Sequence, residues 1–271
     1  MIGYFRFCLA MASFLPAALP TLAAPTRVVS LNLCTDQLLV ALAAPNQIAG
    51  LGRFSRDPDI SAVAGQAKAF PRIGGGAETV LLQKPDLVLA GPYDRPVTSG
   101  ALARQGIPTR IVELWQGFAK GEADILDLGK ALGHPERAEA LVAALQAARG
   151  RLSGLGHGRT ALAIGRGGYI DGAASITGAL IEAAGLRNLA ADAPTGRFMP
   201  LEELLLMQPD IVVLAEGGEA ASDKGAAFLR HPALRGWMQG RRVVHLPPRL
   251  TACPGPALVE ALDRLGRALQ D

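Results

Sequence analysis

An internal repeat constrains the fold of this 271-residue chain more than any other sequence feature. Residues 78–90, ETVLLQKPDLVLA, align without gaps on residues 202–214, EELLLMQPDIVVL, with identical Glu, Leu, Leu, Pro, Asp and Val. Each copy predicts a short helix followed by a buried strand of the parallel type, because a residue that precedes proline avoids helical angles. A looser echo aligns residues 35–39 with residues 177–181, each in a helix that follows a strand. The chain is therefore predicted to hold two related α/β lobes.

The segment between the two copies is predicted to be helical. Residues 122–132 and 136–155 are rich in Ala and Leu, with charged residues on the faces that the leucines leave free. At 1.5 Å per residue the second helix would extend over about 30 Å, which suits a rigid connection between lobes. An ordinary surface helix within one domain is the alternative. We expect an N-terminal lobe over residues 24–120, a helical linker over 121–156 and a C-terminal lobe over 157–271.

The first 23 residues have the pattern of a secretory signal peptide. One charged residue, Arg6, precedes an apolar run, and small side chains follow it. Cleavage is predicted after Ala23, with Ala24 as the second choice. A membrane anchor is the alternative, but it needs about 20 apolar residues, and two prolines interrupt this run. We therefore expect a soluble, exported protein that does not span the membrane.

Composition and motif spacing exclude several function classes. Lys and Arg number 27 against 24 Asp and Glu, and no basic run exceeds Arg241-Arg242, so nucleic acid is not expected as a partner. The glycine-rich residues 74–76 and 165–168 lack the spacing of nucleotide-binding loops. The four histidines do not have the spacing of metal ligands. No cofactor and no metal site built from protein ligands are expected.

Two cysteines, Cys34 and Cys253, remain after the predicted cleavage. Their number is even, and disulfides persist in the compartment to which the protein is expected to be exported. The sequence therefore allows either a disulfide or two buried, unpaired thiols. Thr35 and Asp36 are predicted to cap a helix that follows the first strand, and a helix N-terminus can lower the pKa of a thiol. An exported Cys-dependent hydrolase that uses Cys34, with His245 as its base, is therefore an alternative function. No hydrolase signature surrounds Cys34.

The repeat places one glutamate at the start of a helix in each lobe, Glu78 and Glu202. The helix dipole explains each acid separately, but not why each lobe carries one. An exposed carboxylate on each of two rigidly joined lobes suits a two-point contact with basic residues of a partner protein.

At this level of detail the sequence resembles the ABC-transporter periplasmic binding proteins for cobalamin and ferric siderophores, the class with a helical backbone between two lobes. The resemblance covers essentially residues 27–269. Each motif is weak alone, but their order and spacing together are fairly specific. The motifs are RVVSLN from residue 27, IAGL from 48, Glu78 with KPDLVLA from 84, GIP from 106, LGKALG from 128, AAGLRN from 183, Glu202 with QPD from 208, GRRV from 240, and GP from 255.

The resemblance implies two Rossmann-like lobes joined by a long rigid backbone helix, with a ligand groove between them. It also implies delivery of the ligand to an inner-membrane permease, whose arginines would meet Glu78 and Glu202. The expected protein is a monomeric periplasmic receptor of an ABC importer and not an enzyme. Its cargo would be a metal chelate, either a cobalamin-type corrinoid or a ferric siderophore. A haem-binding receptor, with Tyr169 as an iron ligand, is a further alternative.

The predicted groove residues lie in loops after strand ends, where ligands of α/β lobes gather. Aromatic side chains there could lie against a corrin or catechol ring, and arginines could hold anionic groups. For the tyrosines and Trp115, packing at a lobe surface is the alternative. The predicted residues are Asn32, Cys34, Arg53, Phe54, Tyr93, Arg95, Trp115, Tyr169, Phe198, Arg249 and Cys253.

Two features depart from the pattern of this class. Pro200 stands where the class usually has a small hydroxyl residue two positions before the second-lobe glutamate. Paired cysteines are not general to the class, and both fall in predicted groove loops. We hypothesise that Cys34 and Cys253 meet across the groove, where they either form a disulfide or contact the ligand.

Overall fold

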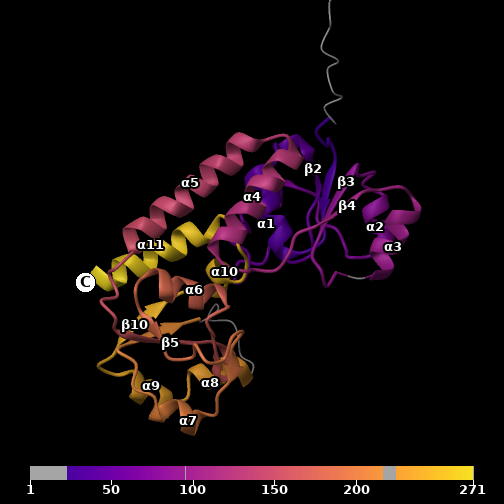
Figure 1. Cartoon of the computed structure of the whole chain (residues 1–271). Coiled ribbons are helices and arrows are strands. Elements are labelled where there is room, and N and C mark those ends of the chain that lie inside the picture. The colour runs from indigo at the N-terminus through magenta and orange to yellow at the C-terminus, as the bar shows by residue number, and fades with distance from the viewer. Residues whose placement is uncertain (1–22, 95, 216–223, 271) are drawn as a thin grey trace, which may run out of the picture.

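A computed structural model describes residues 23–94, 96–215 and 224–270. The chain forms two α/β lobes connected by long helices (Figure 1). Almost all of the predicted signal peptide lies outside the described residues. Within the described ranges, no helix combines the length and the apolarity needed to cross a bilayer.

The N-terminal lobe is built on a parallel sheet of four strands in the order β2-β1-β3-β4. The strands are β1 (Val28–Ser30), β2 (Ile48–Gly50), β3 (Leu87–Ala90) and β4 (Thr109–Ile111). The helices are α1 (Leu33–Leu42), α2 (Ala77–Leu81) and α3 (Pro96–Arg104), with 3-10 turns η1 (Pro45–Gln47) and η2 (Gln66–Ala69). Helix α2 and strand β3 confirm the helix-strand unit predicted for the first repeat.

The C-terminal lobe has the same parallel arrangement, because β5 pairs with β7 and β9, and β9 pairs with β10. These strands are β5 (Thr160–Ile164), β7 (Arg187–Asn188), β9 (Ile211–Leu214) and β10 (Arg242–His245). Two antiparallel strands, β6 (Tyr169–Ile170) and β8 (Arg197–Phe198), extend the sheet where the sequence predicted only a loop. The helices are η3 (Arg166–Gly168), α6 (Ile176–Ala183), α7 (Leu201–Leu206), α8 (Lys224–Leu229), α9 (Pro232–Met238), α10 (Pro248–Thr251) and α11 (Ala257–Gln270).

The repeated aspartate has the same role in both lobes. Oδ2 of Asp86 accepts hydrogen bonds from the backbone N–H and the hydroxyl of Thr26, both at 2.7 Å, just before β1. Oδ2 of Asp210 accepts the equivalent pair from Thr160, both at 2.7 Å, at the start of β5. In each lobe the residue before the repeated strand thus fixes the start of its neighbouring strand.

Two helices connect the lobes, α4 (Phe118–Leu132) and α5 (Pro135–Leu152). They meet at Gly133, whose positive φ of 82° closes α4 with a left-handed residue. Proline at the first position of α5 is compatible with a helix start. Helix α5 has 18 residues, three fewer at its C-terminal end than predicted, and it extends alongside α11 from one lobe to the other (Figure 1).

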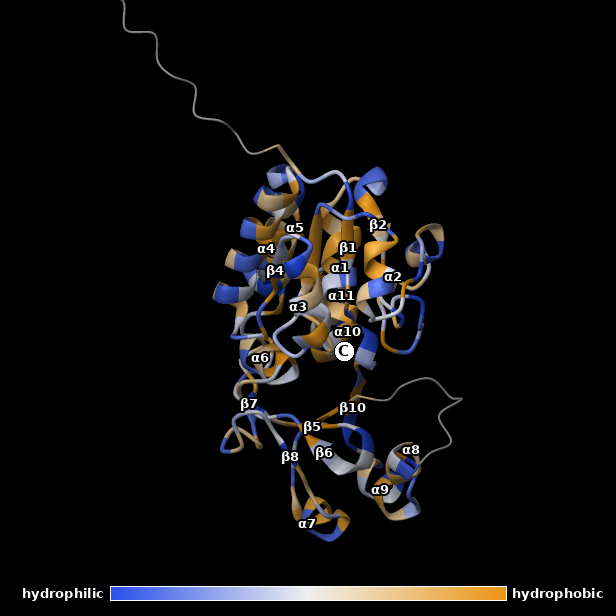
Figure 2. Cartoon of the chain, turned by 90° about the vertical axis from the view of Figure 1, so that its right-hand side faces the viewer, coloured by the Kyte–Doolittle hydropathy of each residue, from blue (hydrophilic) through white to orange (hydrophobic). Residues whose placement is uncertain are grey.

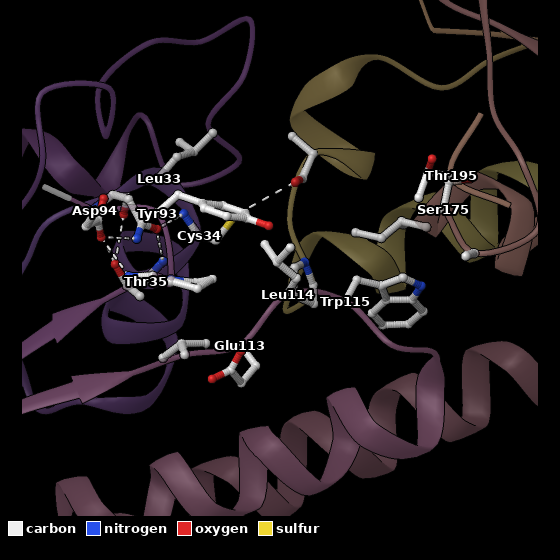
Figure 3. Close-up of a pocket in the computed structure, with 18 residues that line it drawn as sticks. Leu33, Cys34, Thr35, Tyr93, Asp94, Glu113, Leu114, Trp115, Ser175 and Thr195 are labelled. Carbon is white, nitrogen blue, oxygen red and sulfur yellow. Dashed lines mark hydrogen bonds between the residues drawn. The ribbon is translucent and has the colours of Figure 1, made fainter. Parts of the chain in front are cut away.

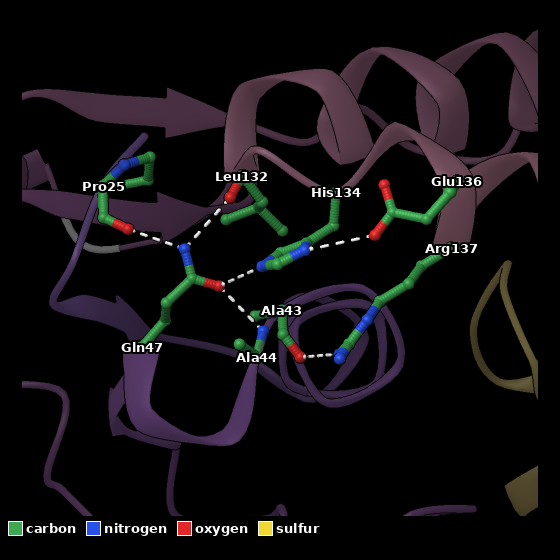
Figure 4. A network of polar contacts seen from close by, with 8 residues as sticks. All are labelled: Pro25, Ala43, Ala44, Gln47, Leu132, His134, Glu136 and Arg137. Atoms are coloured by element: carbon green, nitrogen blue, oxygen red, sulfur yellow. Dashed lines mark hydrogen bonds and ion pairs between the residues drawn. The ribbon is translucent and has the colours of Figure 1, made fainter. Parts of the chain in front are cut away.

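The side chain of Gln47 joins three separate segments at this junction (Figure 4). Its Nε2 donates to the carbonyl of Pro25 at 2.7 Å and to that of Leu132 at 3.0 Å. Its Oε1 accepts from the backbone N–H of Ala44 at 2.7 Å and from Nε2 of His134 at 2.9 Å. The hydrogen bonds of Gln47 therefore link the start of the N-terminal lobe to the turn between α4 and α5.

One continuous hydrophobic core draws residues from both sheets and from α1, α4, α5, α6 and α11. Alternate strand residues point into this shared core or into a separate outer core of their own lobe, as the period of a strand requires. In β1, for example, Val28 belongs to the shared core and Val29 to the outer core under α2 and α3. Figure 2 shows the hydrophobic centre around β1 and hydrophilic residues along α4 and α5. The core thus holds the two lobes in one arrangement.

Candidate ligand-binding site

A cavity of about 510 Å³ lies between the two lobes (Figure 3). The N-terminal lobe contributes residues 32–35 and 91–94, which follow β1 and β3. Residues 112–115, which lead from β4 to α4, form the floor between the lobes, and the C-terminal lobe contributes residues 174–176 and Thr195. The cavity therefore lies at the carboxyl ends of parallel strands, as predicted.

Asn32 organises the wall formed by the N-terminal lobe. Its Oδ1 caps α1 by accepting the backbone N–H groups of Cys34 and Thr35, at 3.0 and 3.1 Å. Its Nδ2 donates to Oδ2 of Asp94 at 2.7 Å, and the N–H of Gly91 donates to the same oxygen at 2.6 Å. Helix α1 begins at Leu33, earlier than predicted. Thr35 takes part in its cap as predicted, because its hydroxyl accepts the backbone N–H of Asn32 at 3.3 Å, whereas Asp36 does not. Asp94 lies between the predicted groove residues Tyr93 and Arg95, in a loop expected to line the groove, and it is a polar residue just beyond a buried strand.

Asp36 lies fully buried behind this wall. Its Oδ1 accepts the N–H of Gly52 at 2.8 Å, whereas its Oδ2 has no hydrogen-bond partner in the described part of the chain. Burial raises the pKa of this carboxyl to about 7; hydrogen bonds from Ser30 and Gly52 oppose the rise, and the charge of Asp94 adds to it. Asp36 is thus a carboxyl that changes charge near neutral pH.

Two predicted aromatic residues occupy facing sides of the cavity. Tyr93 is 84% exposed and extends from the N-terminal lobe toward the cavity centre (Figure 3). Trp115 lies on the opposite side, near α6, and packs edge-on against Phe118 with ring centroids 5.2 Å apart. Leu114, which was not predicted, adds an apolar side chain that is 53% exposed.

The wall formed by the C-terminal lobe is small and neutral. Ser175 caps α6 through its Oγ, which accepts the N–H of Gly178 at 2.8 Å, and Ile176 and Thr195 complete this side. None of these residues was predicted. No sequence signal distinguishes a serine or threonine that contacts a ligand from one that only caps a helix or lies in a loop.

Several other predicted groove residues lie outside this cavity. The hydroxyl of Tyr169 donates to the carbonyl of Thr195 at 2.9 Å, and its ring contacts that of Phe198 at 5.2 Å between centroids. Arg249 pairs with Glu260 at 3.2 Å. Residue 95, the predicted Arg95, is outside the described residues.

Two further cavities adjoin the first. One of about 230 Å³ shares Tyr93 and Asp94 and adds the predicted Arg53 and Phe54, whose guanidinium and ring lie 4.5 Å apart. Another of about 590 Å³ shares Trp115 and continues toward α5. The cleft therefore provides a row of adjoining spaces rather than one small pocket.

A family model described as periplasmic binding protein matches residues 28–250. The chain belongs to this family. Its two lobes and the cleft between them are the expected architecture, and the predicted fold class is confirmed.

Solved structures of similar fold include proteins with three named ligands. A periplasmic heme-binding protein from Pseudomonas aeruginosa is 24% identical with a TM-score of 0.71, covering 90% of this chain and 92% of that one. An ABC-type Fe3+-hydroxamate transport protein from Saccharomonospora viridis is 23% identical, with a TM-score of 0.69 and coverages of 92% and 94%. The vitamin B12 binding protein of Vibrio cholerae is 19% identical, with a TM-score of 0.66 and coverages of 91% and 97%. A comparison with curated protein sequences finds no match.

In this periplasmic binding protein, Cys34 and Cys253 are joined by a disulfide, with their Cα atoms 5.1 Å apart. The bond ties the start of α1 to the loop that precedes α11. Cys253 itself is buried, but its neighbours Ala252 and Pro254 line the cavity together with Cys34. The disulfide therefore forms part of the cleft wall and leaves no free thiol at Cys34.

Glu78 and Glu202 are exposed in α2 and α7, at the outer sides of the two lobes (Figure 1). Neither forms an ion pair with a residue in the described ranges. In the same ranges, no three or more His, Cys, Asp or Glu side chains gather in a way that could hold a metal ion.

Proposed function

We propose that this periplasmic binding protein captures a metal chelate in the cleft and delivers it to the inner-membrane permease of an ABC importer. A cobalamin-type corrinoid is the first candidate and a ferric siderophore the second. We further propose that residues 1–23 direct export to the periplasm and that the mature receptor acts as a monomer. The ligands named for the similar structures support this class of cargo.

The row of adjoining cavities with aromatic walls is the observation that carries the proposal. A space of about 510 Å³ with adjoining spaces on both sides accommodates a ligand much larger than an amino acid or a single sugar. Tyr93 and Trp115 offer flat surfaces on opposite sides. A planar macrocycle presents large apolar faces that stack against such side chains.

The charge of the lining favours a corrinoid over an anionic chelate. Asp94 and Glu113 both line the main cavity, and two groups already hold Asp94 in place. A carboxylate accepts hydrogen bonds from the peripheral amides of a corrin ring. A ferric catecholate carries negative charge and would be repelled. Among ferric siderophores, a neutral hydroxamate complex therefore fits better.

Haem is a third candidate because of Tyr93. Tyrosine can serve as an axial ligand of haem iron, and this tyrosine is exposed in the cleft. Tyr169, the tyrosine predicted for this role, already donates its hydroxyl hydrogen bond to Thr195. The hydrolase alternative lacks its nucleophile, because the disulfide occupies the sulfur of Cys34.

The test is a fluorescence titration of the mature protein with cobalamin, a ferric hydroxamate, a ferric catecholate and haem. We expect saturable 1:1 quenching by cobalamin that disappears in Trp115→Phe. Trp237→Phe is the matched control, because Trp237 is buried among residues of the C-terminal lobe away from the cleft, and its quenching should persist. Saturation by an iron chelate alone would replace the corrinoid with that cargo. No saturation by any of the four would refute the proposed cargo class.

We also propose that Glu78 and Glu202 dock the receptor on its permease. Both carboxylates are exposed, and each stands on a separate lobe. The double variant Glu78→Gln/Glu202→Gln should retain cargo affinity and lose most uptake. Glu139→Gln, an exposed glutamate of α5, is the control and should transport normally. Unchanged uptake in the double variant would remove this role.

A further inference from the structure

Six positions are identical between the two copies of the repeat, and the structure shows what most of them do. The aspartates fix strand starts, and the prolines and valines are buried. The first of the two leucines packs against the outer core of its lobe. The glutamates and the second leucines, Leu82 and Leu206, are exposed and have no such role. The fold itself therefore gives no reason for these two identities.

Leu82 and Leu206 are 77% and 80% exposed, among the most exposed large apolar side chains in the described ranges. A single exposed leucine is common and needs no explanation. Here the same exposure occurs at the same repeat position in both lobes. The repeat therefore places an exposed leucine at the same position in each lobe, and packing does not account for it.

Each leucine stands four residues after the exposed glutamate of its own helix. Leu206 is the last residue of α7, and Leu82 follows α2 with helical angles, φ −59° and ψ −24°. Residues four apart lie on one face of a helix. Each lobe thus presents a carboxylate and a leucine side by side, Glu78 with Leu82 and Glu202 with Leu206. We call these two surfaces the paired docking patches.

We propose that Leu82 and Leu206 form the apolar half of the contact with the permease. The proposal rests on the proposed docking by Glu78 and Glu202, and it adds what the partner must look like. Because the two docking patches repeat the same residues, the permease must offer two like surfaces. Each would present an arginine or lysine beside an apolar hollow that accepts a leucine.

The two halves of each docking patch should act on different steps of binding. A carboxylate attracts a basic partner over a distance, so it raises the association rate, and salt weakens its effect. A leucine contributes only when its surface leaves water, so it slows dissociation, and salt hardly affects it. This difference separates the leucine proposal from the glutamate proposal.

The experiment measures the binding kinetics of the mature receptor on its permease held in lipid nanodiscs, at several salt concentrations. The variant Leu82→Ser/Leu206→Ser should dissociate at least about tenfold faster, with the association rate and its salt dependence unchanged. The variant Glu78→Gln/Glu202→Gln should associate more slowly and lose salt dependence. Each single leucine variant should give a similar, smaller effect. Thermal melting and the cargo titration verify that every variant is folded.

Val97→Ser is the matched control, because Val97 is 82% exposed on α3 and lies outside the repeat. It should change the dissociation rate less than about twofold. An unchanged dissociation rate in the double leucine variant would overturn this inference while the glutamate contact stood. Equal loss in Val97→Ser, or equal binding to empty nanodiscs, would also overturn it. Wild-type receptor that binds cargo but not the permease would refute the proposed docking itself.

Discussion

The two lobes share one strand arrangement but contribute unlike surfaces to the cleft. The N-terminal lobe provides the polar and aromatic groups, with Asn32 and Asp94 held by a hydrogen-bond network and Tyr93 exposed beside them. The C-terminal lobe provides small neutral residues such as Ser175 and Thr195. The repeat therefore governs the buried strands and the outer helices, whereas the cleft is lined by loops that the two lobes do not share.

The largest expected effect comes from removing the covalent tie between the lobes. Cys34 and Cys253 are 219 residues apart in sequence, and closing so long a loop restricts the unfolded chain strongly. Cys34→Ser should lower the free energy of unfolding by about 2–5 kcal/mol, measured by urea denaturation. Cys253→Ser and reduced wild-type protein should show the same loss. A wild-type midpoint that does not respond to reductant would contradict the expectation.

The second prediction concerns a difference between the lobes in how the free energy of unfolding depends on pH. In the repeat, Gly178 aligns with Asp36, so the C-terminal lobe has no acid at this position. The folded pKa of Asp36 is raised from 3.8 to about 7, so between these values only the unfolded chain releases its proton. Stability should therefore fall as pH rises from about 4 to about 7 and level off above, with a ceiling of about 4 kcal/mol.

Asp36→Asn should flatten this profile, measured by urea denaturation between pH 4.5 and 8. Asp171→Asn is the control in the C-terminal lobe, because burial also raises the pKa of Asp171. It should flatten the profile less. Parallel profiles for wild type and Asp36→Asn would show that the charge of Asp36 does not set the pH dependence.

The third prediction compares the two walls of the cleft by cargo affinity. Asp94→Asn removes a charged acceptor that Asn32 and Gly91 hold in place, and it should weaken cobalamin binding about tenfold. Ser175→Ala on the opposite wall should change affinity less than about threefold. Isothermal titration calorimetry measures both. An equal loss in the two variants would show that recognition is shared between the lobes.

The smallest expected effect concerns the strand starts that the two lobes have in common. Asp86 accepts bonds from Thr26 and also from the N–H of Arg27 at 2.9 Å, whereas Asp210 accepts its bonds only from Thr160 in the described structure. Asp86→Ala should therefore lower the melting temperature by a few degrees and Asp210→Ala by less. A larger loss for Asp210→Ala would reverse this ranking of the lobes.

The frame of the molecule was predictable because local patterns determine it. Proline followed by a run of apolar residues identified β3 and β9, and leucine spacing identified α4 and α5. These signals lie within a few residues of the elements that they describe. The position of the loops after the strand ends then placed the predicted groove at the end of the sheets where the main cavity lies.

The composition of the cleft was less predictable, because loops from distant parts of the chain meet there. Tyr93 and Trp115 line the cleft as predicted. Tyr169 and Phe198 instead lie in the antiparallel strands β6 and β8. Those two-residue strands are too short to show a periodic pattern. Asp94 points into the cleft because Asn32 holds it, and these residues are 62 positions apart. No local pattern reports such a contact.

The shared core between the sheets means that the lobes are distinct in shape but not in stability. Helix α5 packs against α1 of the N-terminal lobe and along α11, which packs against α6 and β10 of the C-terminal lobe, so neither lobe keeps its inner face covered without the other. Calorimetry should record a single heat-absorption peak, and fragments that end or begin near residue 120 should aggregate rather than fold. We therefore expect the protein to melt as one cooperative unit, in which neither half can be exchanged as an independent module.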